Sequence, residues 1–279
     1  MNMTTKRLSV ITVSFRDPSG LNRTLESLAA LLPFSDYDFN WEIIVVDGSP
    51  ALNQETLNRH LKVFGPRLKS LEEEPQGIYG AMNFGISKAT GEYIWFLNGG
   101  DRLKSAGILC KLLKRRGDLI IGGADLYRDG RYLYSRIPES DLLSNVRGVN
   151  HVCHQAVLYR RALFETVGVF SPRFRIIADY EHLYRCHLAG VECSISPECF
   201  VDYDMSGEST HWRETFQEYR KLSEELRARV GRGEYFHHSL VLSLESIKIR
   251  IIKAVSESTF APIFRPGWIF MKRRAWRKR

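Results

Sequence analysis

The chain has 279 residues and a formal net charge of +8, with 44% hydrophobic and 26% charged residues. These apolar residues suffice for a sizeable core in one large domain, or in one domain with an appendage. The five cysteines are odd in number and form no CxxC pair, which argues against a disulfide framework or a zinc site and favours a reducing, cytosolic compartment. No uninterrupted apolar run reaches roughly 18 residues, and we expect neither a signal segment nor a spanning helix.

Apolar strands and helices alternate along the first half of the chain. Strands are predicted over residues 8–15, 41–46, 68–72, 93–97 and 119–122, helices over 21–32 and 53–64, and a loop that enters a helix over 77–89. This alternation indicates an α/β fold with a right-handed, mainly parallel sheet. Ligands of such sheets bind beyond the carboxyl ends of the strands, where Asp47 and Asp101 lie.

The pattern changes after residue 125. We predict a hairpin around residues 128–130, a strand over 156–159, and helices over 161–167, 180–189 and 215–230. An apolar stripe from Leu240 to Val255 indicates one more helix. We place the boundary between a catalytic region (1–212) and a helical, basic C-terminal extension (213–279) near residue 212.

The last fifteen residues carry seven basic side chains and no acid, and Trp268, Phe270 and Trp276 are interleaved with them. One interpretation is a solvated tail. The other is a segment for the headgroup layer of an anionic membrane, which predicts peripheral attachment to the cytoplasmic face. Nucleic acid is not expected as a partner, because no other part of the chain is typical of a nucleic-acid module.

Three features of the sequence are candidates for chemistry. Asp47 can accept hydrogen bonds from a base or ribose, or it can be an ordinary residue of an Asp-Gly-Ser-Pro turn. Asp101 follows a Gly-Gly pair and can hold Mg²⁺ or Mn²⁺ against a diphosphate, or it can cap the next helix. Between two strands, residues 76–92 carry a cluster of glycines that a packed helix alone does not explain.

Four segments in order resemble the family-two glycosyltransferases of bacterial polysaccharide assembly, which have the GT-A fold, and most closely those of colanic-acid type. They are LSVITVSF, EIIVVDGS, QGIYGAMNFGISKATGEYIWFLNGGD and HQAVLYRRALFETVGVFSPRFRIIADYEH. MSGEST is a weaker fifth match. The resemblance covers roughly residues 7–212, and its specificity comes from the order and spacing of the segments.

The resemblance implies a donor side and a metal ligand. Asp47 would contact the nucleotide, and Asp101 would ligate Mg²⁺ or Mn²⁺. The remaining donor-binding residues would be Thr12, Ser14, Gly77, Tyr79, Asn83 and Asn98. Many family members have Asp-x-Asp-Asp where this chain has Asn-Gly-Gly-Asp over residues 98–101, so Asp101 is the single carboxylate of that motif.

The resemblance also implies a catalytic base and an acceptor side. Asp179 matches the base, with a salt bridge to Arg175 or Arg185 as the alternative. His154, Gln155, Glu181, Ser209 and His211 would lie on the acceptor side, and Ser209 or His211 could also reach the diphosphate or metal. A purely structural role for His154 stays open.

The implied function is transfer of a sugar, with inversion, from a nucleotide-diphosphate-sugar to a hydroxyl of a lipid-linked glycan in cell-surface polysaccharide biosynthesis. The alternative is a catalytically degenerate protein that binds sugar nucleotides or scaffolds an assembly complex. Dehydrogenase and phosphoryl-transfer functions lack their GxGxxG and Walker loops.

Overall fold

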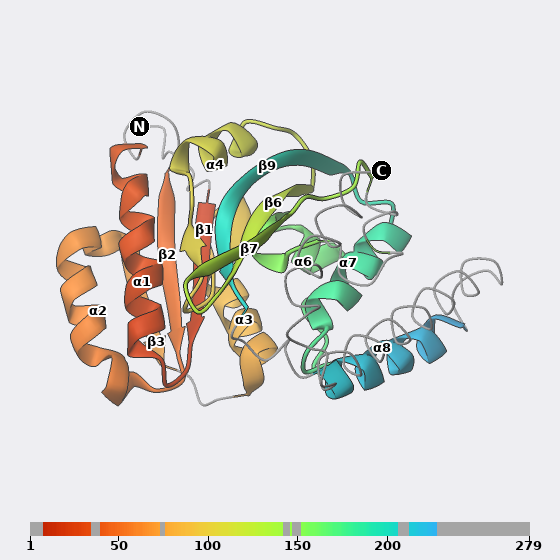
Figure 1. Cartoon of the computed structure of the whole chain (residues 1–279), viewed down its shortest axis with the longest axis horizontal. Coiled ribbons are helices and arrows are strands. Elements are labelled where there is room, and N and C mark those ends of the chain that lie inside the picture. The colour runs from red at the N-terminus through yellow and green to blue at the C-terminus, as the bar shows by residue number, and fades with distance from the viewer. Residues whose placement is uncertain are drawn as a thin grey trace, which may run out of the picture.

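A computed structural model describes residues 8–34, 40–72, 76–141, 146, 152–205 and 212–227. The chain forms three layers, with a sheet between two sets of helices (Figure 1). One face is covered by α1 (Pro18–Leu28), α2 (Pro50–Phe64) and α4 (Ala106–Leu113), and the other by α3 (Gly77–Lys88), α6 (Leu163–Thr166) and α7 (Ala178–Leu188), with α8 (Trp212–Arg227) next to α7.

The strand order is β3-β2-β1-β4-β8-β6-β9-β5, and β7 pairs with β6. The strands are β1 (Leu8–Ser14), β2 (Trp41–Asp47), β3 (Leu68–Glu72), β4 (Tyr93–Phe96), β5 (Arg102–Leu103), β6 (Leu119–Arg128), β7 (Arg131–Arg136), β8 (Val157–Arg160) and β9 (Cys193–Asp204). The first four strands of this order run parallel, β8 is antiparallel to both neighbours, and β6 and β9 are parallel again. The predicted α/β class with a mainly parallel sheet is confirmed.

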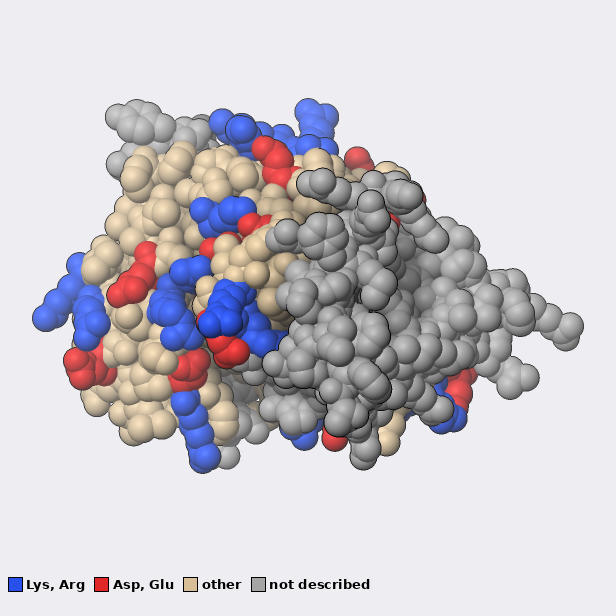
Figure 2. Space-filling view, viewed as in Figure 1, with Lys and Arg blue, Asp and Glu red and all other residues tan. Residues whose placement is uncertain are grey.

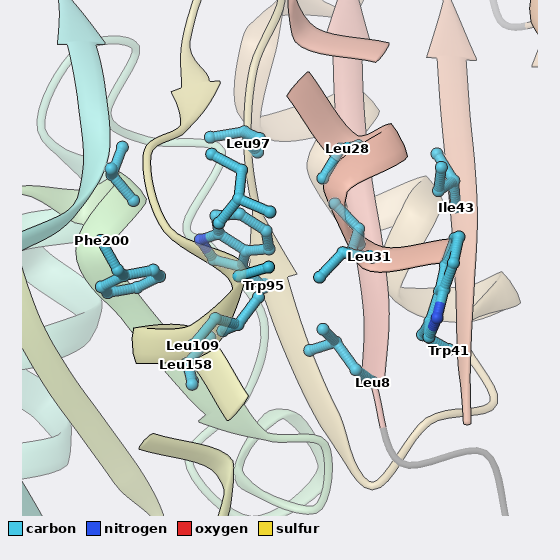
Figure 3. Close-up of a cluster of buried hydrophobic side chains, with 14 of the residues drawn as sticks. Leu8, Leu28, Leu31, Trp41, Ile43, Trp95, Leu97, Leu109, Leu158 and Phe200 are labelled. Atoms are coloured by element: carbon cyan, nitrogen blue, oxygen red, sulfur yellow. The ribbon is translucent and has the colours of Figure 1, made fainter. Parts of the chain in front are cut away.

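The central strands are buried on both faces, as their continuous apolar sequences predict. Alternate residues of β1, β2 and β4 face opposite layers, so Trp41, Ile43 and Trp95 pack toward α1 and α4. Figure 3 shows these side chains with Leu28 and Leu109 of the covering helices. The opposite face of the same strands packs against α3, α6 and α7.

The helices begin and approach the sheet for identifiable reasons. Asp17 caps α1 by accepting a hydrogen bond from the Gly20 amide at 2.8 Å, and Pro18 occupies the first turn. In α3, a β-carbon at Gly85 would lie 2.6 Å from Ile11 Cγ2. The absence of a side chain at Gly85 therefore lets α3 lie close to β1 and β2, which explains part of the glycine cluster.

The second half of the sheet differs from the sequence prediction. No strand was predicted over Cys193–Asp204, yet β9 pairs with both β6 and β5. Ser194, Ser196 and Pro197 interrupt its apolar pattern, which is why the strand was missed. The helix predicted over 161–167 is shortened to Leu163–Thr166, and the stripe from Leu240 to Val255 lies outside the described residues.

Acidic and basic side chains lie beside one another on the described part of the face in Figure 2. Seven of the basic residues behind the net charge of +8 belong to residues 265–279, which are not described. Within the ranges that are described, no helix combines the length and the hydropathy needed to cross a bilayer.

A buried carboxylate ties the amino ends of the central strands together. Glu42 Oε1 accepts hydrogen bonds from the Ser9 hydroxyl at 2.8 Å and from the Thr90 hydroxyl at 2.6 Å, and Oε2 lies 3.0 Å from Lys69 Nζ. Burial opposes ionisation of Glu42, but hydrogen bonds from Thr90, Lys69 and Ser9 together lower its pKa to about 2.

We predict that Glu42→Gln lowers the free energy of unfolding by roughly 2 kcal/mol at neutral pH, because the amide places an NH₂ group against the Lys69 ammonium. The lowered pKa stabilises the fold above the ordinary value of 4.5 and this contribution is lost as the pH falls toward about 2. Urea unfolding at several pH values in this range measures how the free energy of unfolding changes with pH in the wild type and the variant. The difference from wild type should shrink on acidification, whereas the exposed control Glu55→Gln should change little at any pH.

Candidate functional site

Asp47 lies at the carboxyl end of β2 and is fully buried. Its Oδ1 accepts hydrogen bonds from the Ser49 amide at 2.9 Å and from Asn53 Nδ2 at 2.7 Å, so one oxygen serves the turn. Its Oδ2 is buried and has no hydrogen-bond partner among the described residues. Asp47 is therefore a turn residue through Oδ1, while Oδ2 is available to accept a hydrogen bond from a ligand.

Asp101 follows β4 and is also buried, at 3% exposure. The Asp204 amide of β9 donates to Asp101 Oδ1 at 2.9 Å, and a β-carbon at Gly100 would lie 3.9 Å from Asp204 Oδ2. The loop is held by Thr24 of α1, whose hydroxyl lies 2.7 Å from the Asp101 carbonyl oxygen and accepts from the Gly100 amide at 3.0 Å. Asp204 thus adds a second carboxylate beside Asp101, the single carboxylate of the Asn-Gly-Gly-Asp segment.

The residues around Asp101 suit a hard divalent cation. Burial raises the pKa of Asp101 well above its ordinary value, and the charge of Asp204 adds to this effect, so a cation there would offset an unfavourable negative charge. Asn98 Oδ1 is a buried oxygen with no partner among the described residues. The described ranges contain no group of three or more His, Cys, Asp or Glu side chains placed to hold a metal ion.

Three of the predicted donor-binding residues, Gly77, Tyr79 and Asn83, lie in the first two turns of α3. Gly77 begins the helix with a φ of +78°, a conformation that favours glycine. The Tyr79 hydroxyl lies 2.7 Å from Asp179 Oδ1, so Tyr79 contacts the predicted base. Asn83 donates to the Phe170 carbonyl oxygen at 2.9 Å and accepts from the Phe170 amide at 3.0 Å, which fixes the loop before α7.

Asp179 lies in the first turn of α7 and is partly exposed. The salt bridge to Arg185 that we considered for it is made instead by Glu181, whose two oxygens lie 2.8 and 3.0 Å from the guanidinium. Arg185 also donates to the Val169 carbonyl oxygen at 2.8 Å. Glu181 is therefore engaged in holding the turn before α7, while Asp179 remains accessible at the surface.

A buried 3₁₀ turn, η3 (His154–Ala156), directly precedes β8. Burial raises the pKa of Asp101 and the Gln155 side chain partly opposes this, while burial lowers the pKa of His154 and the charge of Asp179 opposes that. Burial raises the pKa of the Cys153 thiol to about 12, and Asp101 and Asp179 both add to this increase. The charges of Asp101 and Asp179, which come from different elements, therefore both act on Cys153 directly before this turn.

His154 belongs to an aromatic cluster beneath this turn. Its ring stacks on Phe96 with centroids 5.2 Å apart, and Nδ1 lies 3.1 Å from the Tyr159 hydroxyl. Burial lowers the pKa of His154, which keeps the imidazole neutral. Its Nε2 is buried and without a partner among the described residues. The structural interpretation of His154 thus accounts for one ring nitrogen and leaves the other open to a ligand.

Sequence reasoning missed three residues of this edge. Asp204 was hidden because β9 was not predicted, and Thr24 because a threonine within a helix carries no distinctive pattern. Phe15 directly follows β1 and is 50% exposed, and an exposed aromatic residue at the carboxyl end of a parallel strand is the signal that could have identified it. The remaining predicted residues divide as follows: Thr12 and Ser14 are buried in β1, and Ser209 and His211 lie outside the described residues.

We predict that Asp101→Asn raises the melting temperature in the presence of a chelator by about 2–4 °C at neutral pH. A raised folded-state pKa makes the ionised carboxylate destabilising, so the wild type loses stability as the pH rises from the ordinary value of 3.8 toward the folded-state value. Asparagine keeps the oxygen that accepts from Asp204 and removes the charge. Thermal melts across this pH range should show the gap widening with pH, and a wild type more stable than the variant at neutral pH would contradict the prediction.

Two relatives of known sequence are named glycosyltransferases. The chain is 34% identical over 155 residues to a PGL/p-HBAD biosynthesis glycosyltransferase of Mycobacterium tuberculosis, an alignment that covers 53% of this chain and 58% of the relative. The chain thus spans little more than half the length of this relative. A second M. tuberculosis protein, described as an uncharacterized glycosyltransferase, is 31% identical over 212 residues, which covers 73% of this chain and 77% of that protein.

Solved structures share the fold. TarS of S. aureus (residues 1–349) has a TM-score of 0.64 at 16% identity, covering 94% of this chain and 77% of that one, and TarS has also been solved with UDP and with UDP-GlcNAc. The mannosyltransferase PcManGT of Pyrobaculum calidifontis, solved with GDP-Man and Mn²⁺, has a TM-score of 0.60 at 14% identity, covering 99% and 89%. These likenesses show a GT-A-like fold. The family model described as Glycosyl transferase family 2 matches residues 9–168, more than half of the chain, and the chain therefore belongs to glycosyl transferase family 2.

Proposed function

We propose that the protein transfers one sugar from a nucleotide-diphosphate-sugar to a glycan hydroxyl in an inverting single displacement. The acceptor oxygen forms a bond to the anomeric carbon, and the bond from that carbon to the diphosphate breaks, so that the nucleoside diphosphate leaves with the electron pair. Asp179 takes the proton of the acceptor hydroxyl. General-base assistance of this kind accelerates a reaction by roughly 10²–10⁴-fold.

The carboxyl edge of β1, β2 and β4 supports binding of the donor. Asp47 Oδ2 is a buried acceptor suited to the hydroxyl or N–H groups of a nucleoside, and the exposed Phe15 ring offers a surface on which a base can stack. Asp101 and Asp204 would hold Mg²⁺ or Mn²⁺ beside the diphosphate. A bound divalent cation neutralises the negative charge that grows on the leaving diphosphate.

The single observation that carries the proposal is a set of buried polar atoms without partners among the described residues: Asp47 Oδ2 after β2, Asn98 Oδ1 after β4 and His154 Nε2 before β8. Asp101 lies in the same loop as Asn98, and the charge of Asp179 acts on His154. A displacement requires a site for the leaving group on one side of the anomeric carbon and a base on the other. The two carboxylates come from a loop and from a helix, and most of the rate enhancement would come from positioning the donor and the acceptor relative to them.

The acceptor and the cellular setting are proposed from the resemblance and from the C-terminal sequence. The acceptor would be a polyprenyl-diphosphate-linked oligosaccharide, and the product would enter exopolysaccharide of the cell surface. The basic and aromatic residues over 265–279 support peripheral attachment to an anionic membrane on its cytoplasmic face, where such an acceptor is displayed.

We predict that one nucleotide sugar in a panel of UDP-, GDP- and dTDP-sugars with Mn²⁺ or Mg²⁺ releases nucleoside diphosphate, most rapidly when a membrane lipid extract supplies the acceptor. Asp179→Asn should lower kcat by about 10²–10⁴-fold while leaving the donor-induced rise in melting temperature intact. Asp101→Ala should lose both the turnover and the dependence on metal.

The matched control is Asp129→Asn, an equal change at the exposed hairpin turn between β6 and β7, which should leave kcat within about 2-fold. A panel in which no donor is turned over, even with lipid extract, and none raises the melting temperature would point to a degenerate scaffold protein. Turnover that survives Asp179→Asn would remove that residue from the role of base.

We predict that deletion of residues 261–279 abolishes binding to vesicles that contain anionic lipid, because this segment carries seven of the basic residues behind the net charge of +8. Each such residue contributes roughly 1 kcal/mol of attraction near an anionic surface. Vesicle sedimentation at low and high salt measures the effect, and neutral vesicles are the control. Unchanged sedimentation of the truncated chain would show that the basic segment is not the anchor.

A further inference from the structure

The backbone that leads into α7 is held by a side chain from α8. Glu218 Oε1 accepts from the Arg175 amide at 2.8 Å, and Oε2 accepts from the amides of Ile176 at 2.9 Å and Ile177 at 3.1 Å. The residue at the N-cap position, Ile177, makes no side-chain cap of its own. A carboxylate that receives three backbone N–H groups at a helix N-terminus is stabilised by charge-assisted hydrogen bonds and by the helix dipole.

The helix that carries Glu218 is firmly docked. Tyr219 and Leu222 are 4% and 3% exposed and belong to the same buried cluster as α7. The Tyr219 ring meets the Tyr180 ring edge to face, with centroids 4.9 Å apart. Lys221 Nζ donates to the Arg173 carbonyl oxygen at 3.1 Å. The position of the Glu218 carboxylate is therefore set by the packing of the residues that follow it in α8.

Ile176 is held from two directions at once. Its amide donates to Glu218, and its carbonyl oxygen lies 2.8 Å from the hydroxyl of Tyr79. The same hydroxyl lies 2.7 Å from Asp179 Oδ1. Asp179 follows the last clamped amide by only two residues, so the place of the first turn of α7 between α3 and α8 determines where its carboxylate lies.

We propose that Glu218 is a positioning residue for the transfer reaction, acting through the backbone of residues 175–177 to hold Asp179 at the acceptor hydroxyl. This inference rests on the proposed function, in which Asp179 takes the proton. Glutamine cannot replace the carboxylate here, because it has a single acceptor oxygen and its NH₂ group would face backbone N–H donors. A misplacement of about 1 Å at a reacting group can cost about 10²-fold in rate.

The test compares Glu218→Gln with Glu225→Gln in the full chain, using the donor that the wild type turns over. Glu225 lies on the same helix and forms an ion pair with the Arg173 side chain, so its substitution removes an equal charge and weakens the docking of α8. We expect Glu218→Gln to lower kcat by about 10–100-fold, with the donor KM and the donor-induced melting shift within about 2-fold of wild type. Glu225→Gln should keep kcat within about 2-fold.

Each result has a distinct meaning. A wild type that turns over no donor defeats the proposed function itself. With an active wild type, the inference is overturned if Glu218→Gln retains full kcat, if Glu225→Gln loses as much, or if the loss appears in donor KM. Should Glu218→Gln not fold, Glu218→Asp decides the matter: it keeps the charge and shortens the reach, and a kcat equal to wild type would overturn the inference.

Discussion

Parallel pairing of β1 with both β2 and β4 is the constraint from which the rest of the site follows. Because the three strands run in one direction and are buried on both faces, their carboxyl ends meet at a single edge. Asp47 ends β2, and the loop that carries Asp101 follows β4 and is held by Thr24 of α1. α3 can contact these strands closely because Gly85 has no side chain.

Contacts between residues far apart in the chain hold Asp101 and the first turn of α7 in place. Asp101 depends on the Asp204 amide, and the first turn of α7 depends on Tyr79 from one side and Glu218 from the other. The buried negative charge at Asp101 costs stability in the absence of a ligand, as its raised pKa indicates. The tightly packed sheet and the Glu42 network make this cost tolerable.

The sequence allowed prediction of those strands and residues whose structure is determined by neighbouring residues in the chain. Continuous apolar runs end at Asp47 and Asp101, so the strands and both carboxylates were found together. β9 was missed because serines and Pro197 interrupt its pattern, and its pairing with β6 and β5 is a property of the assembled sheet. Residue type does not tell which way a side chain points. The ion pair of Glu181 with Arg185 and the packing of His154 among aromatic rings were therefore not predictable from the sequence. The partnership of Glu218 with α7 spans 41 to 43 positions and leaves no local signal.

The dependence on β9 and α8 has a consequence for biosynthesis on the ribosome. The segment that defines the family ends at residue 168, and the strands of the donor edge can pair once it has emerged. The partner of Asp101 and the side chain that holds the backbone leading into α7 are translated later, at residues 204 and 218. A nascent chain can therefore pair β1, β2, β3 and β4 well before the partners of its two carboxylates exist, so that the proposed transfer activity would be gained only near the end of synthesis and prematurely terminated chains would be inactive.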